Sequence, residues 1–185
     1  MELRKQELTD ISDIAHFKNL RSLDLSFNTI SDISALAELE HLKVLSLYRN
    51  RIDDISALAK LCELTDLEIN NNRIADLTPL KDLINLEKLD LHYNDITDIT
   101  ALAELVNLKR LFIQNNKIED ISVLSGLADL ETVNIYYNNG IKDFTPLFAL
   151  TKLKTLTLGF NGVMITEELL KELQTHLPDC KIDLR

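Results

Sequence analysis

Asparagine recurs at a fixed interval along most of this 185-residue chain. Six of these asparagines are 22 residues apart and a seventh follows after 23: Asn28, Asn50, Asn72, Asn94, Asn116, Asn138 and Asn161. Leucine keeps the same interval from Leu20 to Leu130, and each unit reads LxxLxLxxNxIxDIxxLxxL. A repeat of this length indicates a solenoid, in which each unit buries its apolar face only against its neighbours.

Each unit predicts one strand with a single buried face. In LxxLxL, apolar and polar residues alternate with the period of a strand. Leu45 and Leu47 should therefore point into the core. The intervening Val44, Ser46 and Tyr48 should point outward.

The return segment of each unit, residues 54–61 in the same repeat, is too short for a full helix. It predicts a 3₁₀ turn or a single helical turn. A serine or threonine starts this segment in every unit, and we interpret it as the N-cap that satisfies free backbone N–H groups. These residues are Ser12, Ser34, Ser56, Thr78, Thr100, Ser122 and Thr145.

The repeated polar residues are interpreted as structural. An asparagine at the end of each strand can bond backbone groups of adjacent turns, and a stack of them satisfies polar groups that would otherwise be buried unpaired. Aspartates recur in the same way, and we interpret them as groups that bind the turns. They are Asp10, Asp32, Asp54, Asp76, Asp98, Asp120 and Asp143.

The two ends of the chain differ. The N-terminus starts inside a repeat, so the strand around Leu3 should present an open edge, guarded by Glu2, Arg4 and Lys5. Either those charges suffice or the edge pairs with another copy. At the C-terminus, residues 166–176 predict a helix, with Thr166 as its cap.

After this helix a final strand is expected, with Cys180 and Ile182 on buried positions. The helix should close the last turn of the core, as repeat proteins require. We therefore divide the chain into repeats over 1–162 and a C-terminal helical cap with a final strand over 163–185.

Composition excludes several classes of function. The net charge of −10 argues against nucleic acid or anionic lipid as a partner and favours a basic protein. No apolar run approaches the roughly 20 residues of a membrane helix. The first ten residues lack the apolar core of a secretory signal, so we expect a cytoplasmic protein unless a leader was removed.

No pattern in the sequence indicates catalysis. Two cysteines are too few for a disulfide framework, and the four histidines show no metal-ligand spacing with cysteines or carboxylates. Phosphate-binding glycine loops and nucleophile motifs are missing from the sequence as well. We expect neither an enzyme nor a bound cofactor or metal.

The unit resembles the leucine-rich repeats of bacterial internalins, and it is similar to those of phosphatase-1 regulatory subunits. The features that carry this resemblance are the 22-residue length, the isoleucine after the asparagine and the D-I-S/T-x-L segment. It implies an α/β solenoid: a right-handed horseshoe with a parallel concave sheet of about nine strands and short 3₁₀ or helical turns on the convex side. It also implies binding of proteins without cofactors.

Function should reside in the variable outward positions of the strands. Seven of the ten phenylalanines and tyrosines fall there or just before a repeated asparagine, although folding does not require exposed rings. Aromatic side chains are typical of binding hot spots. The position before each repeated asparagine is expected to be half buried at the rim, which weakens Phe27 and Phe160 as contacts. We predict that a partner contacts Tyr48, His92, Tyr93, Phe112, Tyr136, Tyr137 and Phe160.

Within this set, Phe112 and Tyr136 are expected to be near neighbours. Aromatic residues also suit strands and pack along a sheet, which is the structural alternative. The inserted pair Asn139 and Gly140 either reshapes the adjacent rim for a ligand or is a neutral change of loop.

These observations predict a non-catalytic scaffold that holds a protein partner on its concave face. One alternative is a structural protein that self-associates through the N-terminal edge strand. Another is an internalin-like bacterial factor that binds a host protein.

Overall fold

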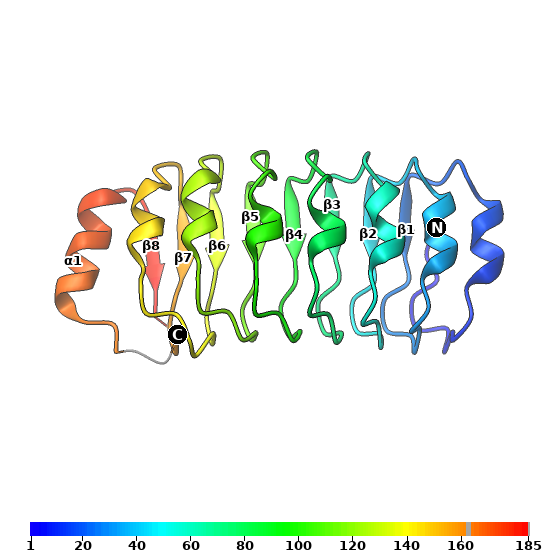
Figure 1. Ribbon diagram of the computed structural model, residues 1–185, viewed down its shortest axis with the longest axis horizontal. Helices are drawn as coiled ribbons and strands as arrows, with labels where there is room; N and C mark the ends of the chain where they lie inside the picture. Colours follow the sequence, from blue (N-terminus) through cyan, green and yellow to red (C-terminus); the bar gives the residue numbers. More distant parts are fainter. Residues whose placement is uncertain (162–163, 185) are drawn as a thin grey trace.

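The computed structural model describes residues 1–161 and 164–184, and in it the chain forms an open solenoid of stacked turns (Figure 1). One sheet of parallel strands runs the length of the molecule in the order β1 to β8. The strands are β1 (Ser22–Asp24), β2 (Val44–Ser46), β3 (Asp66–Glu68), β4 (Lys88–Asp90), β5 (Arg110–Phe112), β6 (Thr132–Asn134), β7 (Thr155–Thr157) and β8 (Lys181–Asp183).

The register of the sheet follows the repeat. Leu23 of β1 pairs with Leu45 of β2, 22 residues on, and the same step holds up to β6. Between β6 and β7 the step is 23, since Val133 pairs with Leu156, so the loop absorbs the insertion and the sheet continues unchanged. The N-terminal segment pairs with β1 through one bridge, Glu2 to Asp24, in place of the ninth strand.

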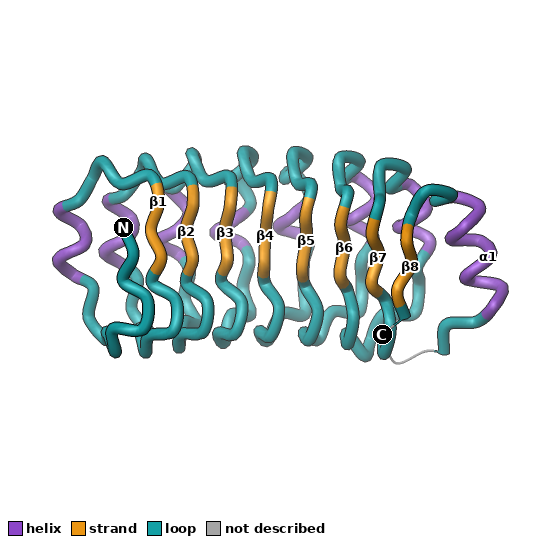
Figure 2. The backbone as a smooth tube through the Cα atoms, turned by 180° about the vertical axis from the view of Figure 1, so that it is seen from behind, coloured by secondary structure: helices purple, strands orange, loops and turns teal. Residues whose placement is uncertain are grey.

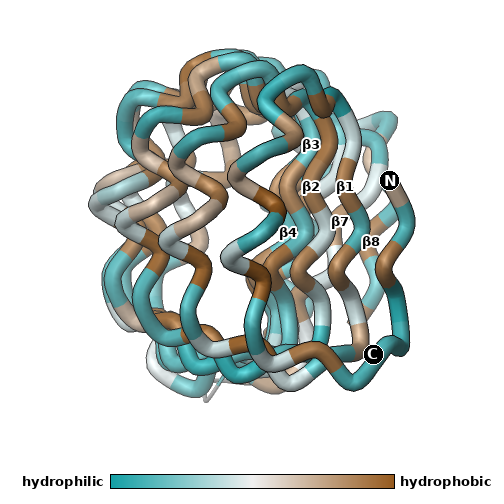
Figure 3. Tube along the Cα trace, turned by 90° about the vertical axis from the view of Figure 1, so that its right-hand side faces the viewer, coloured by the Kyte–Doolittle hydropathy of each residue, from teal (hydrophilic) through white to brown (hydrophobic). Residues whose placement is uncertain are grey.

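Short 3₁₀ turns form the wall opposite the sheet, as the length of the return segment predicts. Seen along the axis of the solenoid, strands and turns face each other across the stack (Figure 3). The turns are η1 (Ser12–His16), η2 (Ser34–Glu38), η3 (Ser56–Lys60), η4 (Thr78–Leu80), η5 (Thr100–Leu102), η6 (Ser122–Gly126) and η7 (Thr145–Ala149).

The core is a column of leucine and isoleucine between these two walls. Residues at the repeated positions, such as Leu45, Leu89 and Leu111, are at most 1% exposed. Burying one such side chain contributes about 1.5–3 kcal/mol. The repetition therefore provides a continuous core although no single turn has one of its own.

The asparagine ladder predicted from the spacing is confirmed. The amide nitrogen of Asn94 donates to the carbonyl oxygens of Leu91 (2.9 Å) and Ile69 (3.1 Å). Its side-chain oxygen accepts from the backbone N–H of Ile74 at 3.0 Å. Each asparagine thus joins its own turn to the preceding one, and its side chain serves the fold.

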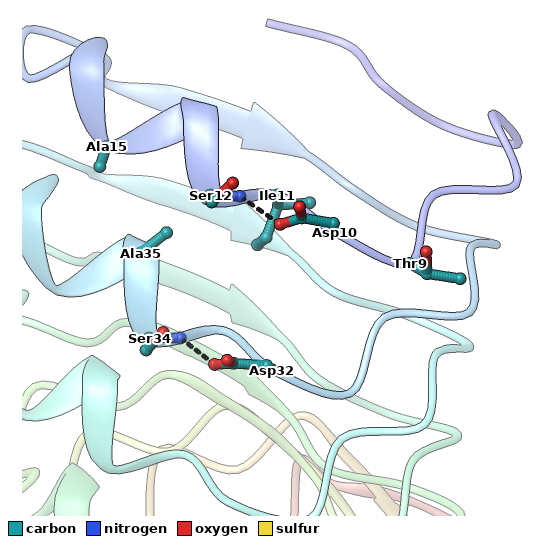
Figure 4. Close-up of a pocket in the computed structure, with 8 residues that line it drawn as sticks. All are labelled: Thr9, Asp10, Ile11, Ser12, Ala15, Asp32, Ser34 and Ala35. Carbon is teal, nitrogen blue, oxygen red and sulfur yellow. Dashed lines mark hydrogen bonds between the residues drawn. The ribbon is translucent and has the colours of Figure 1, made fainter.

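The aspartates bind the turns as predicted, but the interpretation of the serines and threonines as N-caps is wrong. Asp10 Oδ1 accepts the backbone N–H of Ser12 at 2.8 Å, and Asp32 does the same for Ser34 (Figure 4). The residue before each turn is apolar, and its side chain makes no capping bond. The hydroxyl residue is the first residue of the turn, because the carboxylate two positions earlier already occupies the capping role.

The C-terminal helix α1 (Glu167–His176) forms as predicted, and the hydroxyl of Thr166 accepts the backbone N–H of Leu169. The strand β8 then pairs with β7. Cys180 and Ile182 were expected to be buried and are only partly so, because they lie in the last described turn of the stack. The expected boundary between repeats and cap, at residues 162–163, lies outside the described residues.

Candidate interaction surface

The strands present one continuous outward face, which looks toward the viewer in Figure 2. Three rows of side chains run along this face, one residue from each strand or strand end per row. The first row, to which the outward-pointing Val44 belongs, includes Asp66, Lys88 and Arg110. The second row includes Glu68, Asp90 and Phe112. The third row is Ser26, Tyr48, Asn70, His92, Gln114, Tyr136 and Gly159.

A fourth set of side chains borders the face where the chain leaves each strand, and we call it the rim row. It consists of Lys5, Phe27, Arg49, Asn71, Tyr93, Asn115, Tyr137 and Phe160. Every member has a positive φ, between 52° and 58°. Asparagine tolerates this left-handed conformation, whereas bulky residues rarely adopt it.

At the rim row, residues that the backbone conformation favours can therefore be distinguished from residues that it disfavours. Asn71 and Asn115 are the residues that the backbone favours there. Tyr93, Tyr137 and Phe160 are disfavoured by the backbone, yet they are 55%, 46% and 64% exposed. Backbone strain of this kind is a reason to look for function.

Three rings form a cluster at the C-terminal end, the aromatic trio of Tyr136, Tyr137 and Phe160. The centroid of Tyr136 is 5.7 Å from that of Phe160 and 5.8 Å from that of Tyr137. Tyr137 and Phe160 are 6.4 Å apart. These are favourable aromatic separations, so the trio is preorganised as one apolar contact area.

The insertion lies beside this trio. A Cβ atom on Gly140 would come within 2.2 Å of Cγ of Glu119, so only glycine allows the loop to approach the preceding turn this closely. Asn138 still pairs with Asn116 across the two turns. The loop is thus fixed in place next to Tyr137.

A second aromatic group lies at the N-terminal end. The rings of Phe27 and Tyr48 meet edge to face at 4.8 Å. Three cations surround Phe27: the guanidinium carbons of Arg4 and Arg49 lie 4.6 Å and 5.3 Å from its centroid, and Lys5 Nζ lies at 5.1 Å. The sequence reasoning considered Phe27 as a ring but not the cations around it.

A hydrogen-bonded chain occupies the middle of the face. The amides of Asn70 and Asn71 donate to Nε2 of His92 at 3.1 Å and 3.4 Å, which leaves the proton on Nδ1. Nδ1 then donates to Asp90 at 2.5 Å. His92 also meets the ring of Tyr93 at 5.6 Å, so both predicted residues have fixed orientations.

Phe112 lies on the outward face, as the strand period predicts. It lies in the second row, in register with Asp90 on one side and Asn134 on the other. Among the described residues, its ring contacts no other ring, and Tyr136 turns toward the rim instead. Between these two residues the side-chain oxygen of Gln114 is buried without a partner in the described chain.

Two acids of the face are in ion pairs with cations of the same face. Glu68 pairs with Lys88 at 2.5 Å and Asp66 with Arg110 at 3.9 Å. Asp90 is bound by His92. The acidity of the whole chain is therefore not concentrated on this surface.

The described residues show no constellation for catalysis or metal binding. No group of three or more His, Cys, Asp or Glu side chains among them is arranged to hold a metal ion. Burial raises the pKa of the Cys180 thiol, which opposes formation of a reactive thiolate. The hollow between the first two turns (Figure 4) is lined mainly by the capping residues of η1 and η2.

In residues 1–161 and 164–184, no helix has the length and apolar character needed to cross a bilayer.

The stacked strands, the ladder and the exposed outer rows define a solenoid with a surface open to a macromolecule. The chain matches the family described as leucine-rich repeats in two copies at residues 40–82, 84–126 and 106–149, and a further leucine-rich-repeat family at residues 18–37. It therefore belongs to the leucine-rich-repeat family.

Several solved structures are similar to this chain. Internalin C2 of Listeria monocytogenes is 33% identical, with a TM-score of 0.75 over 85% of this chain and 79% of that one. An internalin (inlF) of the same organism is 35% identical, with a TM-score of 0.67 over 81% of this chain and 51% of that one. A leucine-rich-repeat protein of Leptospira interrogans shares the fold at 22% identity, with a TM-score of 0.77 over 95% and 52%. A search of curated proteins found no match.

Proposed function

We propose that this chain is a non-catalytic module that binds a protein partner across its concave face. The observation that carries the proposal is the set of exposed rings in the rim row, where the backbone disfavours them. A residue that neither fills the core nor suits its backbone conformation has no evident role in folding. Large rigid rings are the residues that contribute most at protein interfaces.

The predicted contact residues divide into three parts along this face. The aromatic trio forms the C-terminal contact, and a second run of rings leads from Tyr93 through His92, at 5.6 Å between centroids, to Tyr48, at 6.5 Å. Phe112 lies deeper on the face than the rim residues and would meet a partner that enters the concave side. A globular surface or a long segment would engage several of these parts at once.

The local charges limit where the expected preference for a basic partner can act. The net charge of −10 still favours a basic protein at long range, because steering follows the field of the whole chain. Close to the face, Glu68 and Asp66 are already in ion pairs, and Asp90 accepts a hydrogen bond from His92. We therefore assign the contact itself to the aromatic rings.

The test compares a double variant of the face with a matched double variant of the convex side. Phe112→Ala/Tyr136→Ala removes two concave rings, and Ile84→Ala/Val106→Ala removes two apolar side chains that are each 51% exposed. Partners captured by the wild-type protein are identified by mass spectrometry, and their affinities are then measured by calorimetry.

We expect the concave variant to lose at least about tenfold in affinity per ring, and the convex variant to bind like wild type. Both should melt within a few degrees of wild type, whereas Leu89→Ala should lose about 2–5 kcal/mol of stability. Equal binding by the two double variants would refute the concave site. Unfolding of the concave variant would show that its rings are structural.

A second candidate is an internalin-like bacterial factor that binds a host protein, favoured by the 33% identity to internalin C2. The first candidate places the chain in the cytoplasm and the second places it outside the cell. The genomic reading frame upstream of Met1 distinguishes them, since a signal peptide there would favour the second.

A further inference from the structure

The rim carries a concentration of arginine at its N-terminal half. The chain has seven arginines and thirteen lysines, so arginine is the rarer cation. Four of the seven arginines nevertheless lie on the first, third and fourth of the loops that follow the strands, together with one lysine. This arginine rim consists of Arg4, Lys5, Arg49, Arg51 and Arg73.

The backbone places these residues side by side. Arg49 and Arg51 flank the ladder residue Asn50, and Arg73 follows the next one, Asn72. The N–H of Arg51 donates to Ile30 and that of Arg73 to Ile52, each in the preceding turn, so the two arginines are stacked one repeat apart. The loops that carry them follow the strands along the lower edge of the face in Figure 2.

Three of these cations contact the ring of Phe27. Arg4, Lys5 and Arg49 each lie within 5.3 Å of its centroid. The charges are therefore no farther apart than roughly one Debye length, about 8–10 Å, and they repel one another. The cation–π contacts hold them together in spite of this repulsion.

The arginine rim is the only place in the described chain where cations without an ion pair gather around one aromatic ring. Eight lysines and arginines elsewhere are in ion pairs, among them Lys109 with Glu87 and Lys154 with Glu131. In the described chain, none of the five rim cations is in such a pair. Glu7 shares the shallow hollow with Lys5, Phe27 and Arg49, and offsets one of the positive charges.

We propose that the arginine rim binds an acidic segment of a protein partner, through carboxylates that span Arg49, Arg51 and Arg73. The planar fork of a guanidinium matches a carboxylate in a bidentate way that an ammonium does not. Phe27 and Tyr48 provide an apolar floor beside these charges. The segment neutralises a group of like charges that this chain leaves unpaired.

A short acidic segment fits better than a nucleic acid. A long polyanion would meet the field of the whole chain, whose 30 acidic residues outnumber its 20 basic ones. A segment of a few residues samples only the local charge, because screening removes the rest beyond about a Debye length. This inference rests on the proposed function only in that the partner is a protein.

The experiment measures binding of fluorescein-labelled hexaglutamate by anisotropy, with hexaglutamine and a single-stranded DNA oligonucleotide as comparison probes. Arg49→Gln/Arg51→Gln/Arg73→Gln removes the central rim cations. Lys109→Gln/Lys152→Gln/Lys154→Gln removes three paired cations elsewhere and has the same net charge. All three proteins are compared at about 50 mM and about 200 mM salt.

We expect hexaglutamate to bind the wild type and the lysine variant alike, and to bind the rim variant at least about tenfold more weakly. Hexaglutamine should not bind, and the affinity for hexaglutamate should fall with salt. Equal weakening of both variants would overturn the proposal, since only net charge would then matter. Tighter binding of the DNA would assign the rim to nucleic acid instead.

Two further measurements separate the remaining outcomes. Dimerisation by light scattering that the rim variant abolishes would identify a second copy as the occupant and overturn the proposal. The double variant Phe112→Ala/Tyr136→Ala should still bind hexaglutamate. Failure of the aromatic face as a protein-binding site is therefore distinguishable from failure of the arginine rim.

Discussion

Replacing a rim tyrosine by asparagine and by alanine isolates the backbone strain on which the proposed site rests. Both substitutions remove the ring of Tyr93, so both lose the same contacts with His92. They differ in how well the new residue adopts the φ of 52° that the rim imposes. The difference between the two variants, less the same difference at a position without positive φ, is therefore a measure of conformational preference.

The expected difference follows from how often each residue adopts this conformation. Asparagine is several-fold enriched in the left-handed region, and a several-fold preference corresponds to about 0.6–1.0 kcal/mol, since tenfold is about 1.4 kcal/mol. Tyr93→Asn should therefore be more stable than Tyr93→Ala by that amount. In a chain of this size the difference is about 1–4 °C in melting temperature.

Equilibrium unfolding in urea, followed by circular dichroism, measures this difference. Tyr137, with a φ of 58°, is a second site where the same gap is expected. Tyr136 is the control, because it does not have the positive φ of its neighbour. Alanine as stable as asparagine at both rim sites would refute the strain argument, and so would an equal gap at Tyr136.

Two other predictions concern the parts of the repeat that we interpret as structural. Asn94→Ala should lose several kcal/mol of stability by urea unfolding, because it leaves one N–H and two carbonyl groups of two adjacent turns unpaired at about 1–3 kcal/mol each. A loss below about 1 kcal/mol would mean that water replaces the ladder. Hydrogen bonds from the following turn lower the pKa of Asp32, Asp76, Asp98 and Asp143 below 3.8. Their stabilisation is thus complete above pH 3.8 and is lost as pH falls through the lower folded-state values, so that Asp76→Asn should flatten the acid limb of a stability profile.

The sequence was sufficient for the backbone because the repeat states each structural requirement seven times. One buried leucine such as Leu89 is weak evidence, but the same position in every unit fixes the strand, its register and its inward face. The ladder followed from Asn94 and its equivalents for the same reason. The step from 22 to 23 residues also located the loop at Asn139 and Gly140 that the sheet tolerates.

The repeat did not predict the capping residue correctly, because two residues in each unit can fill that role. Asp32 and Ser34 recur together, and either can cap a turn. Their spacing is the same under both assignments, so periodicity does not distinguish them. The structure assigns the role to Asp32, which accepts the backbone N–H of Ser34 at 2.8 Å.

The candidate site was predictable in its location but not in its contacts. The outward columns gave the correct face for Tyr136 and Phe112, since the strand period determines which side chains leave the core. The partner of each ring depends on side-chain rotation, and Tyr136 turns to Phe160 in the next repeat. The arginine rim was not predicted, because the contact residues were inferred from aromatic side chains. Its sequence signal is the pair Arg49 and Arg51 on either side of Asn50.

A repeat protein allows function to be inferred from its irregularities. Because the same backbone recurs, Asn71 and Asn115 show within this chain what the rim position requires for folding alone. Departures from that internal standard need another cause, and here they are of two kinds: aromatic rings from Phe27 to Phe160 along the rim row, and the cations Lys5 and Arg49 at its N-terminal end. Because the cations lie only at the N-terminal end and the aromatic trio at the C-terminal end, we expect a partner that meets both to carry an acidic and an apolar part in a fixed order. The orientation of the complex along the solenoid is then determined, and the rim and ring variants should lose affinity independently.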